Sequence, residues 1–119
     1  MEISIGDYVR TDNGEIHKVE DEEDLRIHIK TEKIMFRAWV EDYYGCHKED
    51  RFIVKHSKEI KDLLQIGDII TTNNLCGEIT KIDGDIIYLA NYMGTCKVED
   101  IQSIITKEQI KQIEFRIKE

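Results

Sequence analysis

The residues of this 119-residue chain best suited to recognition chemistry lie in one short stretch, where an arginine and large aromatic side chains gather. They are Arg37, Trp39, Tyr43 and Tyr44. Tryptophan, tyrosine and arginine are the residue types that most often anchor protein–protein interfaces. Because tryptophan is also common in protein cores, Trp39 could instead cover the mouth of a β barrel. The sequence leaves both roles open.

A run of five acidic residues precedes this cluster: Glu20, Asp21, Glu22, Glu23 and Asp24. The chain as a whole has 25 Asp+Glu against 17 Lys+Arg, a formal charge of -8. This balance disfavours direct nucleic-acid binding, which requires a basic face, whereas it suits a basic protein surface. Acidic runs are also common in solvated loops. We count the five residues among the partner-binding candidates.

The sequence gives little support for a metal site or a catalytic site. Four histidines and three cysteines could supply zinc ligands, but neither a Cys-x-x-Cys nor a His-x-x-x-His pair occurs. We therefore expect no metal and free, reduced thiols, with Cys46 and Cys96 as small buried residues. No glycine-rich phosphate loop is present either. The chain is expected to be non-enzymatic and to use no cofactor.

The elements that must carry these residues form a repeat. The first copy starts with Ile5-Gly6-Asp7, which recurs as Ile66-Gly67-Asp68, and its Thr11 recurs as Thr72. If the second turn is two residues longer, the next matching stretch is Gly14-Glu15-Ile16-x-Lys18-Val19 with Gly77-Glu78-Ile79-x-Lys81-Ile82. Ser57-Lys58-Glu59 likewise recurs as Thr106-Lys107-Glu108, each starting with a helix-capping hydroxyl. The repeat predicts a mainly β chain of two tandem SH3-like small barrels or meanders, residues 1–62 and 63–119, packed as one body.

Short β-type segments separated by glycine, asparagine and aspartate fill both copies. Residues 8–11 and 15–19 form a hairpin around Asn13-Gly14. Residues 85–90 contain Ile86-Ile87-Tyr88-Leu89, which is apolar on both faces, and should form the most central strand. Residues 113–117 alternate apolar and charged side chains, which predicts a strand after the second capped helical turn, although an amphipathic helix also fits.

The first copy is longer because an arm, residues 20–44, is inserted in it. Residues 25–30 and 34–40 are predicted to be its two strands. Period two places Ile34, Phe36, Ala38 and Val40 on the core-facing side, and Met35, Arg37 and Trp39 on the other. Trp39 should then be at least partly exposed, and we expect it to be the principal anchor.

Two motifs carry a family resemblance: Ile5-Gly6-Asp7-Tyr8-Val9-Arg10-Thr11, and Ser103-Ile104-Ile105-Thr106-Lys107-Glu108-Gln109-Ile110 with Glu114-Phe115. In these motifs the chain resembles small uncharacterised proteins encoded by phages and prophages of clostridia and related bacteria. The similarity covers both ends of the chain and not the arm. It implies a phage accessory protein. Because the sequence shows neither a signal peptide nor a long apolar run, we expect this protein in the cytoplasm of the infected cell.

Three functions are compatible with these features. The chain could bind and block a host protein, for instance a defence-system nuclease with a basic DNA channel, as anti-CRISPR proteins do. It could instead be a sponge for a nucleotide immune signal, in a pocket between subunits where Trp39 or Tyr92 stacks on the base and Arg37 or Arg116 meets the phosphate. A structural module of SH3 type is the third. A homo-oligomer is compatible with all three, and no membrane segment is expected.

Overall fold

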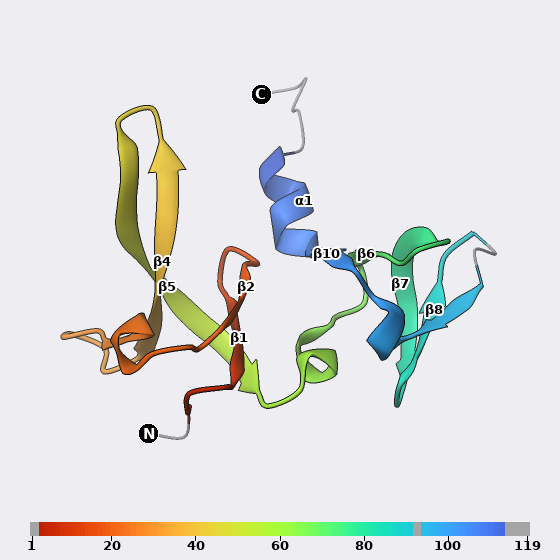
Figure 1. The fold of residues 1–119 in the computed structure, drawn as a ribbon, viewed down its shortest axis with the longest axis horizontal. Helices are drawn as coiled ribbons and strands as arrows, with labels where there is room; N and C mark the ends of the chain where they lie inside the picture. The colour runs from red at the N-terminus through yellow and green to blue at the C-terminus, as the bar shows by residue number, and fades with distance from the viewer. Residues whose placement is uncertain (1–2, 92–93, 114–119) are drawn as a thin grey trace. The chain divides into compact units, whose positions relative to one another are not determined.

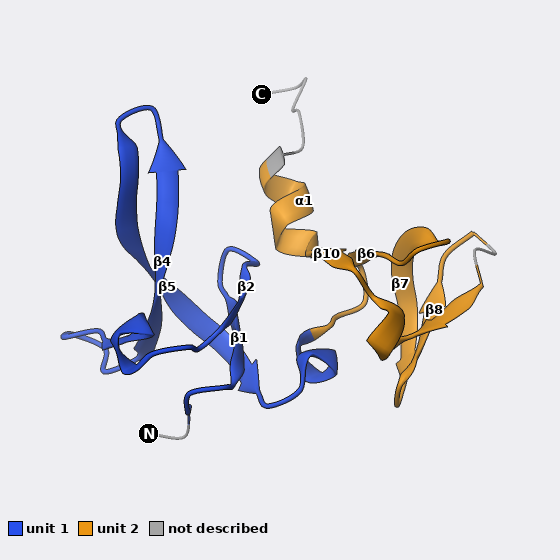
Figure 2. Cartoon of the chain, in the orientation of Figure 1, with its two compact units in different colours: residues 1–63 blue, residues 64–119 orange. Residues whose placement is uncertain are grey.

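The computed structural model describes residues 3–91 and 94–113. The chain is mainly β, as predicted, and divides into two compact units, Met1–Leu63 and Leu64–Glu119 (Figure 2). Each unit contains one antiparallel five-stranded sheet. Within the described residues neither sheet closes into a barrel, because its two outermost strands do not pair with each other.

The sheet of unit 1 has the strand order β2-β1-β5-β4-β3 (Figure 1). Its strands are β1 (Tyr8–Thr11), β2 (Ile16–Lys18), β3 (Leu25–Ile27), β4 (Ile34–Asp42) and β5 (Gly45–Ser57), with 3-10 turns η1 (Glu22–Asp24) and η2 (Ile60–Leu63). The long strand β5 joins the sheet together, since its first part pairs with β4 and its end with β1. The core of the unit contains Ile3, Val9, Val19, Phe36 and Ala38.

Strand β3 is shorter than the predicted strand 25–30. It ends at Ile27, and the chain then turns, with the His28 N–H donating to the Lys33 carbonyl at 2.8 Å. The His28 side chain also accepts a hydrogen bond from the Thr31 N–H at 3.2 Å. This local side-chain bond favours a turn over an extended strand. Ile29 is left 94% exposed as a result.

The sheet of unit 2 has the order β10-β6-β7-β8-β9. Its elements are β6 (Ile69–Thr71), β7 (Cys76–Asp83), β8 (Ile86–Leu89), β9 (Thr95–Lys97), the 3-10 turn η3 (Val98–Asp100), β10 (Ser103–Ile105) and helix α1 (Lys107–Ile113). The central strand is β7 and not the predicted segment 85–90, because β8 lies between β7 and β9 and is thus one place nearer the edge of the sheet. Leu64, Ile70, Ile79, Ile87 and Leu89 form the core.

Helix α1 starts where the capping hydroxyl predicts. Thr106 Oγ1 accepts a hydrogen bond from the Gln109 N–H at 3.3 Å, and Gln109 Oε1 accepts one from the Thr106 N–H at 3.0 Å. This reciprocal capping box stabilises the first turn. The predicted strand 113–117 is wrong at Ile113, which ends the helix. Its other four residues lie outside the described part of the chain.

The Ile-Gly-Asp turn that opens each copy recurs in the structure, and the hairpin after it has a register different from the predicted one. Gly6 and Gly67 both adopt positive φ, 96° and 99°. Their N–H groups donate to the carbonyls of Val19 and Ile79, respectively. Val19 therefore corresponds to Ile79 and not to Ile82, and the second hairpin turn is one residue shorter rather than two longer. The shared Gly-Glu-Ile sequence led to the wrong alignment of Gly14 with Gly77, because Gly77 lies inside β7.

Candidate protein-binding ribbon

The outer parts of β4 and β5 form a two-stranded projection, residues 37–50, which we call the β4–β5 ribbon. Strand β3 pairs with β4 only as far as Phe36, and β1 pairs with β5 only as far as Ile53. Beyond these points β4 and β5 pair only with each other among the described residues. Figure 1 shows the ribbon extending away from the rest of unit 1. The projection is thus formed by β4 and β5, rather than by the predicted arm, residues 20–44.

One face of the ribbon, its outer face, carries Trp39. This side chain is 69% exposed, and it lies opposite Lys48 on β5, with the Lys48 Nζ 5.0 Å from the ring centroid. Arg37, which is half-buried, and Glu41 lie on the same side of β4. The predicted exposure of Trp39 is confirmed, and its role as an anchor remains a prediction. Met35 was expected on this exposed side, but it is buried between its cross-strand neighbours Phe52 and Arg26.

The tip of the ribbon presents both predicted tyrosines. Tyr43 is 96% and Tyr44 93% exposed, and their rings meet edge to face with centroids 5.5 Å apart. Asp42 Oδ1 accepts a hydrogen bond from the Tyr44 N–H at 2.8 Å, and Gly45 adopts a φ of 112° that completes the turn. At about 3.3 Å per strand residue, Tyr43 lies roughly 13 Å along the ribbon from Trp39. The structure therefore places three aromatic candidates on one projection.

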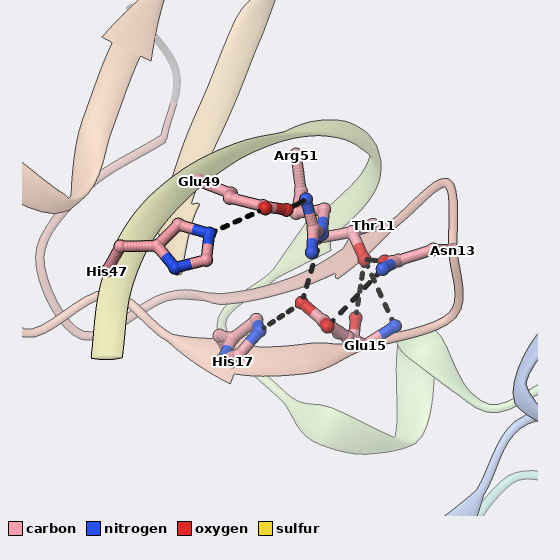
Figure 3. A network of polar contacts seen from close by, with 7 residues as sticks. All are labelled: Thr11, Asn13, Glu15, His17, His47, Glu49 and Arg51. Atoms are coloured by element: carbon pink, nitrogen blue, oxygen red, sulfur yellow. Dashed lines mark hydrogen bonds and ion pairs between the residues drawn. The ribbon is translucent and has the colours of Figure 1, made fainter. Parts of the chain in front are cut away.

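The inner face of the ribbon is held by a polar network that the sequence analysis did not identify (Figure 3). Arg51 donates to Glu49 at 2.5 Å, and Glu49 also pairs with His47 Nε2 at 2.8 Å. On its other side, Arg51 Nε lies 3.8 Å from a Glu15 oxygen, which is an ion pair without a hydrogen bond. Arg51 thereby links the ribbon to the β1–β2 hairpin.

The β1–β2 hairpin orders its half of this network. Thr11 Oγ1 accepts a hydrogen bond from the Glu15 N–H at 3.0 Å, and the Asn13 side-chain amide donates to Glu15 Oε2 at 3.3 Å (Figure 3). Glu15 Oε1 pairs with His17 Nε2 at 3.0 Å, and the His17 ring stacks on Phe36 at 4.4 Å. The network therefore joins the hairpin to the base of β4 as well as to β5. The alternation His47-x-Glu49-x-Arg51 was the available sequence signal for it.

The network also perturbs one carboxyl group. The pKa of Glu49 is lowered from its ordinary value of 4.5, chiefly by its hydrogen bond to His47 and then by its hydrogen bond to Arg51. Both partners favour the charged carboxylate. Because Glu49 is open to solvent, screening weakens this effect.

The acidic run is an ordered 3-10 turn rather than an unstructured loop. Asp24 Oδ2 accepts hydrogen bonds from the N–H groups of Glu20 and Asp21, at 3.0 and 3.1 Å. Asp21 Oδ1 accepts one from the Glu23 N–H at 3.0 Å; Glu20, Asp21, Glu22 and Glu23 are exposed, whereas Asp24 is half-buried. The run leads into β3, whose first residue, Leu25, lies opposite Phe36. It therefore lies near the base of the ribbon, and the tyrosines lie at its tip.

Tyr92 and Arg116, proposed for a nucleotide pocket, lie outside the described residues. In unit 2 the described residues form a depression of about 430 Å³ whose lining includes Glu99 and Asp100. Two carboxylates at its wall disfavour a phosphate group there.

The cysteines differ from the buried residues expected. Cys46 and Cys76 are exposed thiols, and Cys96 is half-buried against the core of unit 2. Cys46 is exposed because it lies near the tip of the ribbon, opposite Glu41 on the outer face. Burial, with the charge of Asp100, raises the pKa of Cys96. Across residues 3–91 and 94–113 no three His, Cys, Asp or Glu side chains are grouped to hold a metal ion.

No protein-family model, curated protein or solved structure matches the chain. Among its described helices, none has the length and apolar character needed to span a membrane.

Proposed function

We propose that this chain is a non-enzymatic phage accessory protein that binds and blocks a host protein through the β4–β5 ribbon. The observation that carries the proposal is the 69% exposure of Trp39 on a projecting ribbon whose tip holds two further exposed aromatic rings, Tyr43 and Tyr44. Aromatic side chains of this size bind partners well because they bury much area with few rotatable bonds. Exposing three of them on one ribbon is costly unless a partner covers them.

Charge favours a basic partner surface. The β4–β5 ribbon, residues 37–50, contains four Asp or Glu against two Lys or Arg, and the acidic run near its base, residues 20–24, adds five carboxylates. A field of this sign speeds encounter with a basic surface and suppresses binding to acidic ones. The DNA channel of a host-defence nuclease has the required charge, and an inhibitor occupying it would act as anti-CRISPR proteins do.

The inner-face network supports a ribbon that binds without large rearrangement. Arg51 joins the ribbon to the β1–β2 hairpin through Glu49 and Glu15. A projection held in this way loses less conformational entropy on binding than a free loop. Burial of the Lys48–Trp39 contact by a partner would also strengthen its cation–π attraction, since desolvation increases such interactions.

We further propose that unit 2 is an SH3-like scaffold. Its 3-10 turn η3 stands before its last strand, and that strand pairs with its first, β6. A helical turn before the last strand is the layout expected of a small SH3-like barrel. Unit 1 follows it less closely, because the 3-10 turn η2 comes after β5.

The test uses the full chain, immobilised, as bait in a lysate of a clostridial host. We expect a stoichiometric host protein on the wild-type chain and on Ile29→Ala, and its loss from Trp39→Ala. Ile29 is the matched control because it is a large apolar residue, 94% exposed, in a different turn of the same unit. Equal capture by all three baits would refute the assignment of the ribbon. A nucleotide released by heating, with no captured protein, would refute blocking in favour of the sponge.

A further inference from the structure

The backbone of β4 has one edge that faces β3, and hydrogen bonding fixes which residues point to it. The His28 N–H donates to the Lys33 carbonyl at 2.8 Å, so the next hydrogen-bonded pair along these strands is Arg26 with Met35. Hydrogen-bonded pairs alternate with non-bonded pairs in an antiparallel ladder. The odd-numbered residues of β4 therefore direct their N–H and C=O groups to the edge away from β5.

Beyond β3 this edge is open. Strand β3 covers β4 only as far as Phe36, and no backbone hydrogen bond among the described residues reaches the outward groups of Arg37, Trp39 and Glu41. An edge of this kind is a template for another strand. The open window is five residues long, from Arg37 to Glu41, because Asp42 begins the turn.

The side chains along this window are self-complementary when two copies run antiparallel. We propose that the edge of β4 pairs with the same edge of a second copy of this chain, with Trp39 opposite the partner's Trp39. Arg37 then lies opposite the partner's Glu41, and Glu41 opposite the partner's Arg37. Cross-strand aromatic pairs and opposite charges both stabilise neighbouring strands. The arrangement is a closed two-fold interface in which the same patch is used by both copies.

The length of the window selects this register. With Trp39 on the two-fold axis, all five residues of each copy face one another. A shift by two residues, the smallest that preserves hydrogen bonding, leaves only three facing residues and places Trp39 opposite a charged residue. Strand β3 prevents the ladder from extending past Phe36. The fully matched register therefore gains the most hydrogen bonds and the two ion pairs.

Pairing at the edges leaves the outer faces free. The two ribbons would join into one four-stranded sheet, with the two Trp39 side chains as neighbours on one face. The dimer would thus double the aromatic surface available to a further partner. The inference stands independently of the proposed host target, because it concerns backbone edges and the chain's own charges.

Sedimentation velocity over a concentration series tests the proposal on the full chain. A five-residue ladder buries less than the roughly 1,200 Å² of standard interfaces, so we expect a reversible dimer that dissociates on dilution. Arg37→Glu should weaken it about tenfold, because like charges then face each other at both ends of the ladder. Lys30→Glu makes the same change of charge in an exposed turn, and it should leave the dimer unchanged.

A mixture of two variants controls for misfolding. Glu41→Arg alone should also weaken the dimer, whereas Arg37→Glu mixed with Glu41→Arg should form a mixed dimer, because opposite charges again face each other at both ends. In the wild type, hydrogen exchange at the amides of Arg37, Trp39 and Glu41 should slow as concentration rises, while the opposite edge at Lys48 stays fast. A chain that remains monomeric, equal effects of Arg37→Glu and Lys30→Glu, or no mixed dimer would each overturn the proposal.

Discussion

Replacing Trp39 by alanine should separate binding from stability, and the structure sets the size of both effects. A tryptophan side chain offers up to about 250 Å² of surface. With 69% of Trp39 exposed, folding covers about 80 Å² of it, worth at most about 2 kcal/mol at 25 cal/mol per Å². A tryptophan in a core would instead cost about 3 to 5 kcal/mol when truncated. We therefore expect a loss in the free energy of unfolding below about 2 kcal/mol and a melting temperature lowered by at most roughly 10 °C.

Binding should respond more strongly than stability does. The exposed part of Trp39, about 170 Å², is what a partner can still cover, and central aromatic anchors typically contribute about 2 kcal/mol or more. The Kd for the captured host protein should therefore rise about thirty-fold or more. Trp39→Phe retains an aromatic ring and should therefore lose less affinity for the partner than Trp39→Ala. Lys48→Ala removes the cation–π contact and leaves the Trp39 ring in place, so it should weaken the binding free energy by only about 0.5 to 1 kcal/mol.

Two measurements show whether Trp39 contributes to binding or to stability. Urea unfolding of each variant gives the stability, and isothermal titration with the captured partner gives the affinity. Ile29→Ala serves again as the matched control, because it removes an exposed apolar side chain away from the ribbon. If Trp39→Ala lost more than about 3 kcal/mol of stability, the residue would belong to the core and the site would be wrong. If both its stability and its affinity were unchanged, the ribbon would bind elsewhere than at Trp39.

Three further predictions concern the frame. The pKa of Glu49 in the folded protein lies below its ordinary value of 4.5. The contacts of the Glu49 carboxylate should therefore stabilise the protein fully above pH 4.5, and this stabilisation should be lost as the pH falls through the folded pKa. The free energies of unfolding of wild type and Glu49→Gln should then converge in acid. Asp68→Ala should cost about 2 to 3 kcal/mol in urea unfolding, since buried Asp68 accepts hydrogen bonds from the N–H groups of Gln65 and Lys107, both at 2.9 Å. Asp7→Ala should cost less, because Asp7 Oδ1 accepts no hydrogen bond, and equal losses would contradict this. Gly67→Ala should lower the melting temperature, since its φ of 99° disfavours any side chain, and an unchanged value would show that the turn can relax.

The parts predicted correctly from sequence are those fixed by local chemistry. Alternation in residues 34–40 was sufficient to orient Trp39 because strand side chains have a period of two. Thr106 marked the start of α1 because an N-cap is a local hydrogen bond. The segment after Thr106 shows where alternation fails. The alternating residues 113–117 predicted a strand, but the capped helix continues to Ile113. A cap acts on the first turn directly, whereas alternation needs a neighbouring strand to pair with.

The parts that were missed depend on contacts between residues far apart in the chain. Strand β5 carries charged or polar residues at most positions between Cys46 and Arg51, so no apolar pattern marks it as a strand. It is held by pairing with β4 and by Arg51, whose partner Glu15 lies in another hairpin. The repeat register was likewise decided by backbone bonds of Gly6 and Gly67, which repeated letters do not reveal.

The polar inner face of the ribbon explains how the outer face can remain exposed. A two-stranded ribbon alone is marginally stable in water, and most proteins stabilise one by packing its apolar face on a core. Here the inner face holds His47, Glu49 and, at its base, Arg51, whose polar contacts with each other and with Glu15 tie the ribbon to the β1–β2 hairpin, while Ala38 on the same face packs on the core of the unit. Because these contacts use polar groups, Trp39 and the tip tyrosines are not needed to hold the ribbon in place. The aromatic residues are therefore free to contact a partner, and removing Arg51 should weaken that contact indirectly, by loosening the ribbon that presents them.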